Sequence, residues 1–215
     1  MEVFHTARIS ANAFDRILSI LRAGGVIAFP TDTAYGLGAD PFNAAAVERI
    51  FEIKGRPEAK PILLVVNSVG MAETVVSAPS PMFHSVAKQF WPGPLTLVLR
   101  AAPSVSANVT ARTGTIGVRW PAAPFAMSLL ERFGKPLTAT SANQSGMPSA
   151  VTADEVRAQL GESVDVLIDG GALPSRIGSS LLDLAVDPPV LLREGPISFE
   201  TLNSFFEGRI RKQVA

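Results

Sequence analysis

The sequence predicts an α/β (α+β) fold, in which a twisted mixed sheet is flanked by helices. Short apolar runs alternate along the chain with longer segments whose apolar residues recur every three or four positions, the pattern of interleaved strands and helices. The apolar runs show little polar alternation, so the strands are expected to be covered on at least part of both faces. Apolar residues make up 47% of the 215 residues, enough to fill a sizeable core.

Capping residues and glycines set the limits of the expected helices. Residues 12–23 carry their apolar side chains on one face and stop at Gly24. Residues 43–54 begin with the N-cap candidate Asn43 and stop at Gly55. On the same grounds, further helices are expected at residues 81–90, 125–133, 153–160 and 199–206.

The expected strands are short apolar runs between these helices. Residues 26–29 form the first, which ends at Pro30, and residues 62–66 form the second. Others are expected at residues 95–99, 115–119, 137–139, 164–168, 180–184 and 190–192. No internal repeat, low-complexity tract or linker separates these elements, so we expect one domain over residues 1–215.

Composition excludes several classes of site. The chain has no cysteine and two histidines, which excludes disulfides, cysteine nucleophiles and metal sites built from thiolates or several imidazoles. The net charge is zero, so the surface as a whole cannot act as a broad electrostatic trap for nucleic acid. Any chemistry on anions must therefore depend on cations gathered locally.

Neither a secretory signal nor a membrane span is expected. Residues 1–8 mix acidic and basic side chains and contain no long apolar stretch. The longest apolar runs, such as residues 62–66, are too short to cross a bilayer. Together with the absence of cysteine, these features predict a cytoplasmic protein without membrane contact.

The segment that follows the first strand is a candidate ligand loop. Residues 30–38 read Pro-Thr-Asp-Thr-Ala-Tyr-Gly-Leu-Gly, and Thr31, Thr33 and Tyr35 could supply hydroxyl groups. The glycines would allow a ligand to approach the backbone closely. An ordinary polar turn explains the same composition equally well, although loops after buried strands commonly bind ligands.

A basic loop connects the helix at residues 43–54 to the next strand. The macrodipole of a helix favours a cation at its C-terminus, which explains Lys54. It does not explain Arg56 and Lys60, which lie beyond the glycine and next to two prolines. A rigid basic loop suits an anionic ligand, because less entropy is lost on binding.

Further polar residues lie at the ends of other strands. Residues 139–146 are rich in small hydroxyl and amide side chains, which a simple turn could also explain. Arg119 and Arg193 each end a strand, and each alone could be a solvated surface charge. Because the loops at strand ends converge in this class of fold, these cations and hydroxyl groups together predict a concave site for a highly anionic ligand. Neither a Walker loop nor a Rossmann glycine fingerprint occurs.

Seven segments, taken together and in order, resemble the YrdC-like threonylcarbamoyl-AMP synthases. They span nearly the whole chain and are Pro-Thr-Asp-Thr-Ala-Tyr-Gly-Leu-Gly at 30–38, Lys-Gly-Arg-Pro at 54–57, Trp-Pro-Gly-Pro-Leu-Thr at 91–96, Gly-Val-Arg-Trp-Pro at 117–121, Ser-Ala-Asn-Gln-Ser-Gly at 141–146, Asp-Gly-Gly at 169–171 and Leu-Arg-Glu-Gly-Pro at 192–196. The resemblance implies helices and a mixed sheet around a large concave cavity. It also implies a nucleotidyltransferase that makes threonylcarbamoyl-AMP and pyrophosphate from L-threonine, bicarbonate and ATP, the first step of threonylcarbamoyl modification of tRNA.

The resemblance also implies residue roles. The catalytic tetrad would be Lys54, Arg56, Ser141 and Asn143. The ATP-binding residues would be Arg56, Lys60, Thr115, Ser141, Asn143, Ser149 and Arg193. The threonine-binding residues would be Thr31, Thr33, Arg119 and Ser179. Two positions depart from longer relatives: Val65 stands where they often have histidine, and Gly178 stands where they tend to have glutamate. Those relatives also carry a second C-terminal domain, so the short, single-domain form is expected.

ATP is expected as a substrate, with Mg²⁺ carried mainly by its phosphates. The sequence offers no carboxylate cage for a metal; Asp32 is the nearest candidate, and capping of a turn explains it at least as well. The expected partners are ATP, L-threonine, bicarbonate and a downstream tRNA threonylcarbamoyl-transferase complex. Direct contact with RNA or tRNA is a further possibility.

Two alternatives remain open. The chain could be an RNA-binding module, but zero net charge and an aromatic content of 7% argue against strong binding and base stacking. It could also be a paralogue that keeps the fold and uses another substrate, which the intact tetrad disfavours. Pyrophosphate formation that requires both threonine and bicarbonate would distinguish the synthase from both.

Overall fold

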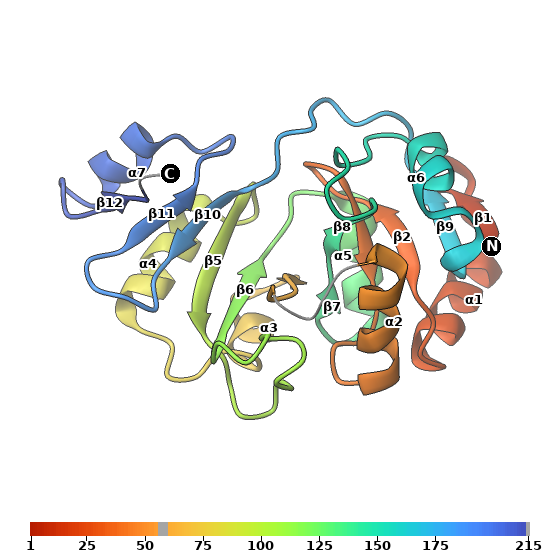
Figure 1. The fold of residues 1–215 in the computed structure, drawn as a ribbon, viewed down its shortest axis with the longest axis horizontal. Helices are drawn as coiled ribbons and strands as arrows, with labels where there is room; N and C mark the ends of the chain where they lie inside the picture. The colour runs from red at the N-terminus through yellow and green to blue at the C-terminus, as the bar shows by residue number, and fades with distance from the viewer. Residues whose placement is uncertain (56–59, 214–215) are drawn as a thin grey trace.

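The strands form two mixed sheets that stand side by side (Figure 1). The computed structural model describes residues 1–55 and 60–213. The five-stranded sheet has the order β1 (Glu2–His5), β9 (Val166–Asp169), β2 (Ile27–Pro30), β3 (Tyr35–Gly38) and β8 (Thr140–Ser141). The seven-stranded sheet has the order β12 (Arg211–Lys212), β11 (Val190–Arg193), β10 (Ser180–Asp183), β5 (Leu95–Arg100), β6 (Thr115–Arg119), β4 (Leu64–Val65) and β7 (Leu137–Thr138).

The prediction of an α/β fold with a mixed sheet is confirmed, and the structure divides the strands between two sheets. The short strand expected at residues 137–139 is where the chain passes between them. Leu137 and Thr138 pair with β4 of the seven-stranded sheet, whereas Thr140 and Ser141 pair with β3 of the five-stranded sheet. Local apolar pattern does not encode this change of pairing partner.

The helices agree closely with the expected ones. They are α1 (Ala11–Arg22), α2 (Ala44–Lys54), α3 (Val69–Glu73), α4 (Pro81–Phe90), α5 (Pro124–Phe133), α6 (Ala153–Leu160) and α7 (Phe199–Phe205), with 3-10 turns at Thr6–Arg8 and Gly161–Ser163. Helix α2 shows why its limits were predictable. The side chain of Asn43 accepts a hydrogen bond from the backbone amide of Ala46, and Gly55 ends the helix in the left-handed conformation, with φ of 56°.

Part of the predicted loop at residues 30–38 is a strand. Residues Tyr35–Gly38 form β3, which pairs antiparallel with β2. Two glycines gave this segment a loop-like composition, but one of them serves packing. A Cβ atom added to Gly38 would lie 2.8 Å from Cε1 of Phe29, so the aromatic ring requires glycine on the neighbouring strand. The sequence reading also missed the short elements β1, α3 and β12.

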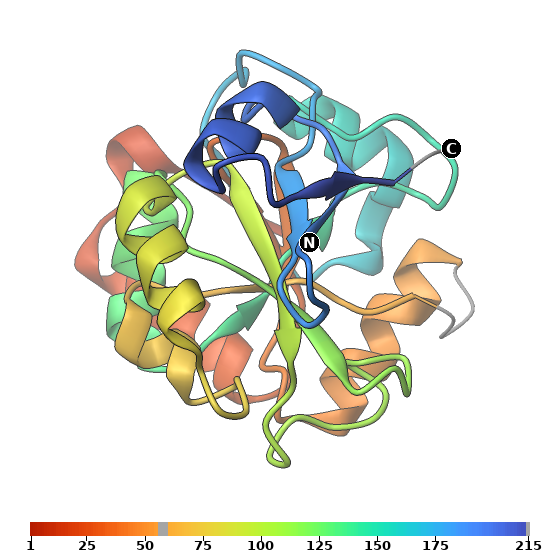
Figure 2. The ribbon, with the colours of Figure 1, turned by 90° about the vertical axis from the view of Figure 1, so that its left-hand side faces the viewer.

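Helices cover the sheets on opposite sides. In Figure 2, α1 (red) and α4 (yellow) lie on one side of the strands, and α2 (orange) and α6 (cyan) lie on the other. Strand β2 is covered on both faces, as predicted. Ile27 and Phe29 pack with α1 and α5, whereas Ala28 belongs to the core that includes α2. Within the described part of the chain, no helix has the length and apolar character needed to cross a membrane.

Candidate functional site

A cavity of about 540 Å³ lies between the two sheets and collects most of the predicted site residues. Its lining includes the turn between β2 and β3, strand β8, and strands β4, β5, β6, β10 and β11 of the larger sheet. The predicted residues that line it are Thr31, Thr33, Lys60, Thr115, Arg119, Ser141, Ser149, Ser179 and Arg193. Arg56 lies outside the described residues. Residues that are up to 162 positions apart in the chain, such as Thr31 and Arg193, thus share one cavity.

Strand periodicity builds the floor of this cavity. On β6, Thr115, Gly117 and Arg119 line the cavity, whereas the intervening Ile116 and Val118 are fully buried in the core on the other face. Strands β5 and β10 continue the same face beside β6. One face of the seven-stranded sheet therefore packs the core, and the other presents side chains to a ligand.

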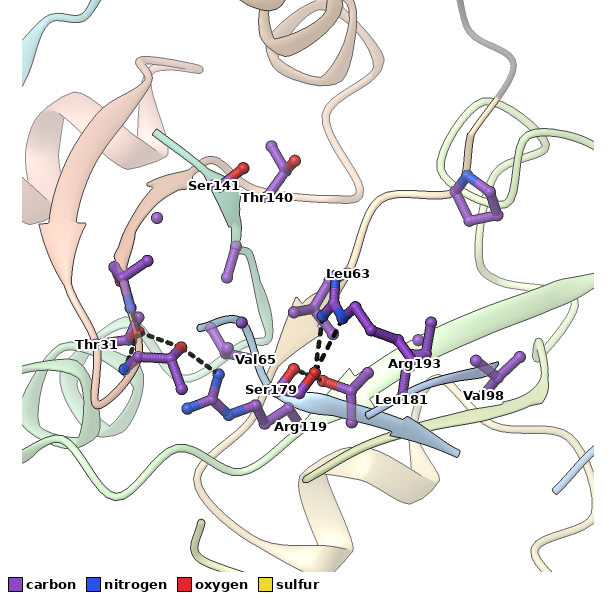
Figure 3. Close-up of a pocket in the computed structure, with 18 of the residues that line it drawn as sticks. Thr31, Leu63, Val65, Val98, Arg119, Thr140, Ser141, Ser179, Leu181 and Arg193 are labelled. Atoms are coloured by element: carbon purple, nitrogen blue, oxygen red, sulfur yellow. Dashed lines mark hydrogen bonds between the residues drawn. The ribbon is translucent and has the colours of Figure 1, made fainter. Parts of the chain in front are cut away.

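At one end of the cavity, Arg119 holds the turn between β2 and β3. Its Nη1 donates a hydrogen bond of 2.8 Å to Oγ1 of Thr33, its Nη2 forms an ion pair with Asp32, and its Nε donates to the backbone oxygen of Gly93 at 3.0 Å. Thr31 closes the turn, since its Oγ1 donates to the backbone oxygen of Ala34 at 2.7 Å. Figure 3 shows Thr31 and Arg119 facing each other at this end.

The charge of Arg119 is buried. Burial lowers the pKa of Arg119, the adjacent carboxylate of Asp32 opposes that change, and the positive charge of Arg193 adds to it. A guanidinium nonetheless remains protonated in proteins. Asp32 therefore serves as the counter-ion of Arg119 rather than as the metal ligand considered from the sequence. Among the described residues, no group of three or more potential metal ligands occurs.

Arg193 and Ser179 form the middle of the site. Nε and Nη2 of Arg193 donate to the backbone oxygen of Ser179 at 3.1 and 2.8 Å. Oγ of Ser179 lies 2.6 Å from Oγ1 of Thr96, which also lines the cavity (Figure 3 shows Ser179 between Arg119 and Arg193). Burial lowers the pKa of Arg193. The site therefore contains a cation at the cavity wall, held in place by the Ser179 backbone, which suits an anionic ligand.

Thr96 was missed as a site residue. It lies in the Trp-Pro-Gly-Pro-Leu-Thr segment noted above, but its place in an apolar run suggested only a strand. The sequence did contain one indication of its role: Thr96 is a hydroxyl residue within a run of leucines and valine, and a buried hydroxyl requires a hydrogen-bond partner. Its partner, Ser179, is 83 residues away and could not be identified from local sequence.

Lys54 contacts the other half of the predicted tetrad, the loop that carries Ser141 and Asn143. Its Nζ donates to the backbone oxygens of Ser141 and Asn143 at 2.5 and 2.9 Å, and lies 3.4 Å from Oδ1 of Asn143. Nδ2 of Asn143 in turn donates to the backbone oxygens of Gln144 and Met147. Neither Lys54 nor Asn143 is among the described residues that line the cavity. Both residues hold the loop that presents Ser141, and their catalytic role stays a prediction from the resemblance.

Tyr35 also supports the site rather than offering a free hydroxyl. Its buried hydroxyl donates to the backbone oxygen of Gly171 at 2.8 Å and accepts from the backbone amide of Gly170 at 3.0 Å. Burial is the main reason that the pKa of Tyr35 is raised, so the phenol stays neutral. A Cβ atom at Gly170 would lie 2.6 Å from Cγ of Pro30, which explains the glycine at this contact. The Asp169-Gly170-Gly171 segment thus fixes the β2–β3 hairpin.

The known proteins that this chain resembles belong to one family. A family model described as telomere recombination, covering Sua5, YciO and YrdC, matches residues 19–195. A threonylcarbamoyl-AMP synthase of Pyrococcus abyssi is 40% identical over 191 residues, which cover 89% of this chain and 56% of the relative. A threonylcarbamoyl-AMP synthase of Thiobacillus denitrificans is 39% identical over 180 residues, which cover 84% of this chain and 95% of the relative.

A solved structure agrees with these sequence relatives. P. abyssi Sua5, complexed with L-threonine, superposes with a TM-score of 0.92 at 37% identity, covering 99% of this chain and 62% of that chain. The chain spans about half the length of its curated relatives from P. abyssi and Bacillus subtilis. It spans nearly the whole length of the relative from T. denitrificans.

Proposed function

The chain belongs to the Sua5/YciO/YrdC family, and on this basis we propose that it makes L-threonylcarbamoyl-adenylate and pyrophosphate from L-threonine, bicarbonate and ATP. One observation carries the proposal: hydroxyl-rich and basic groups from both sheets line a single cavity. A reaction that joins an amino acid, bicarbonate and a nucleotide requires all three in one enclosed site.

The end of the cavity with Thr31, Thr33 and Arg119 is the proposed threonine site. A guanidinium carries five N–H groups, and the hydrogen bonds of Arg119 given above use three of them. The remaining two can bind the carboxylate of the amino acid as a pair. Oγ of Ser179, in the adjacent middle of the site, can contact the substrate's polar groups. The solved P. abyssi relative was complexed with L-threonine, which supports threonine as the amino-acid substrate.

The triphosphate is proposed to lie along the opposite wall. Lys60 and Arg193 supply positive charge, Ser141 and Ser149 supply hydroxyl groups, and Thr115 is a proposed contact to another part of the nucleotide. Arg56 belongs to the proposed nucleotide contacts as well, by its place in the family's motif. Two hydrogen bonds from Arg193 to the backbone of Ser179 hold the guanidinium in place. A fixed cation loses less entropy when it binds phosphate.

The proposed chemistry has two steps. The amine of threonine attacks bicarbonate to form a carbamate and water. A carbamate oxygen then attacks the α-phosphorus of ATP, and pyrophosphate leaves as the phosphorus–oxygen bond to it breaks. All reactants carry negative charge, threonine through its carboxylate, so the cations of the cavity lower the barrier by reducing the repulsion between these groups. Enclosure between the sheets also limits hydrolysis of the carbamate.

Mg²⁺ is expected to arrive as part of the MgATP substrate, held by phosphate oxygens and water. The donor set of the described lining fits this expectation, since Asp183 is its one carboxylate. We place the reaction in the cytoplasm, where its product would pass to a tRNA threonylcarbamoyl-transferase complex. The same family assignment supports a role in tRNA modification.

Mass spectrometry of the product tests the proposal. The protein is incubated with MgATP, carbon-labelled bicarbonate and threonine, with serine and alanine as alternative amino acids and a bicarbonate-depleted control. The expected product is threonylcarbamoyl-adenylate that carries the label, with pyrophosphate released in equal amount. A clear preference for another amino acid, or RNA binding without turnover, would contradict the proposal.

A further inference from the structure

One carboxylate among the described cavity-lining residues has no part in the chemistry above. Asp183 ends strand β10 and lines the same cavity as Arg119 and Arg193. An acid is unexpected in a cavity that gathers cations for phosphate, because it would repel that part of the ligand. Its position must therefore correspond to a part of the ligand that is not anionic.

The strand register places Asp183 away from the threonine end. Asp183 pairs with Val98 of β5, and Val98 pairs with Gly117 of β6. Arg119 lies two residues further along β6 than Gly117, a separation of about 7 Å along a strand. In Figure 3, Val98 lies on the opposite side of the view from Thr31, with Arg193 and Leu181 between them.

The part of the cavity beside Asp183 is apolar. Gly117 has no side chain, and a Cβ atom there would lie 3.4 Å from Cγ2 of Thr96 and 3.5 Å from Cδ1 of Leu63. Leu63, directly before β4, and Val98 on β5 flank Gly117, and Leu181 and Leu192 extend the apolar lining. A planar aromatic group can lie against such a surface and bury its face, while its edge reaches the carboxylate.

The carboxylate of Asp183 is only partly used within the protein. One oxygen, Oδ1, accepts a hydrogen bond of 2.8 Å from the backbone amide of Ala185. This contact orients the side chain at the end of the strand. Among the described residues, no ion pair joins Asp183 to a cation, and no carboxylate contributes to the pKa of Arg193. The second oxygen can therefore accept a hydrogen bond from a ligand.

From this arrangement, and resting on the proposed function, we propose that Asp183 selects the nucleobase: its free carboxylate oxygen accepts a hydrogen bond from the exocyclic amino group of adenine. The base lies on Gly117, Leu63 and Val98, and the ribose leads from there to the phosphates near Arg193. Inosine triphosphate, which carries a carbonyl oxygen in place of that amino group, would place an acceptor against an acceptor. Asp183 is therefore a specificity residue and takes no part in the chemical step.

Nucleotide binding and turnover with ATP and with inosine triphosphate test this inference. Calorimetry measures the Kd of each nucleotide, and pyrophosphate release measures each kcat/KM with threonine and bicarbonate present. The wild-type protein should prefer ATP by about tenfold or more, since a hydrogen bond to a charged group is lost with inosine triphosphate. Asp183→Asn should reduce this ratio by about tenfold, because an amide can also donate to the carbonyl.

A matched control and a second substitution separate selection from folding. Asp154→Asn removes an exposed carboxylate outside the cavity and should leave both the ratio and the thermal midpoint unchanged. If Asp183 merely caps the turn at Ala185, Asp183→Asn and Asp183→Ala would weaken both nucleotides equally, and an unchanged ratio would overturn the inference. A wild-type preference for inosine or guanosine triphosphate would overturn it as well.

Binding and turnover also distinguish the two proposals. Selective binding of ATP that depends on Asp183, without threonine-dependent pyrophosphate release, would support nucleobase selection and contradict the proposed reaction. Threonine-dependent turnover with an ATP preference that does not respond to Asp183→Asn would support the reaction and overturn the selection. Failure of the wild-type protein to bind ATP would overturn both.

Discussion

Oγ1 of Thr33 accepts a hydrogen bond of 2.8 Å from Nη1 of Arg119, and this contact joins the two sheets across one end of the cavity. Thr33 belongs to the turn between β2 and β3, and Arg119 ends β6 of the other sheet. The ion pair between Arg119 and Asp32 strengthens the same junction. The proposed threonine site therefore forms only when the two sheets lie in their observed relative position.

Removal of the Thr33 hydroxyl should weaken threonine binding selectively. Thr33→Val keeps the shape of the side chain but leaves an N–H of Arg119 without its acceptor, which costs about 1–2 kcal/mol. We expect the KM for threonine to rise by about fivefold to thirtyfold, with little change in the KM for ATP. Steady-state kinetics measures both, and Thr33→Ser, which keeps the hydroxyl, is the control. Equal losses for both substrates would argue against a local role.

Lys54 should contribute to stability as well as activity. Its side chain is 4% exposed and binds two backbone oxygens of the loop that presents Ser141. Lys54→Met would leave those oxygens without that donor, at a cost of about 2–4 kcal/mol in the free energy of unfolding. Urea unfolding measures the loss, and displacement of Ser141 should also lower kcat.

A matched variant tests whether Lys54 acts through the loop. Lys60→Met removes an exposed cation that lines the cavity, so it should raise the KM for ATP without lowering stability. An inactive Lys54→Met protein with wild-type stability would instead favour the direct, ligand-facing role that the sequence predicted.

The role of Arg56 remains a prediction from the sequence, since the residue lies outside the described structure. Arg56→Ala is expected to abolish threonine-dependent pyrophosphate release while the fold survives, because a cation of the Lys-x-Arg motif would be lost from the phosphate site. Circular dichroism checks the fold and a pyrophosphate assay checks the activity. Normal turnover in a folded variant would contradict the assignment.

Thr96 should act by positioning Ser179. The two hydroxyl oxygens are 2.6 Å apart and both side chains are buried. Thr96→Val leaves the Ser179 hydroxyl without this partner, at a cost of about 1 kcal/mol, and we expect the KM for threonine to rise by about fivefold. Thr96→Ser should retain most of the affinity. A loss of stability with unchanged threonine KM would assign Thr96 to packing alone.

Glu155 should contribute to the free energy of unfolding at neutral pH, and this contribution should be lost in acid. Arg176 and the backbone amide of Val151 lower the pKa of Glu155 from 4.5 to about 2, and Arg176 also donates to the backbone oxygen of Ser149 at 3.0 Å. Because the unfolded chain takes up the proton first, the stabilisation is fully present above about pH 4.5 and is lost as the pH falls toward 2.

Urea unfolding at several pH values measures this dependence. Glu155→Gln cannot titrate, so its stability should fall less steeply than that of the wild-type protein between pH 4.5 and 2. Other carboxylates contribute to the wild-type curve, and the difference between the two proteins isolates Glu155. Asp154→Asn, whose carboxylate is exposed on the same helix, is the control. Parallel curves for the wild type and Glu155→Gln would contradict the prediction.

Local pattern was sufficient to predict most of the elements. Asn43 precedes α2 and Gly55 ends it, as the sequence predicted. The limits of α4, α6 and β6 also agree with the expected ranges. Capping and periodicity depend on residues within a few positions of each other, so a single sequence contains the necessary information. Strand β3 was missed because Gly36 and Gly38 disfavour a strand locally, whereas packing against Phe29 requires a glycine.

The sequence by itself determined the chemical types in the site: hydroxyl groups, cations and no thiolate, placed at the ends of apolar strands. The tertiary structure decided which of them face the cavity. Lys54 turns toward a loop 87 residues away, Thr96 meets Ser179 across 83 residues, and Asp183 enters the site through its register with β5. The physical reason is that hydrogen bonds and strand pairing join groups according to their position in space, which local periodicity does not specify.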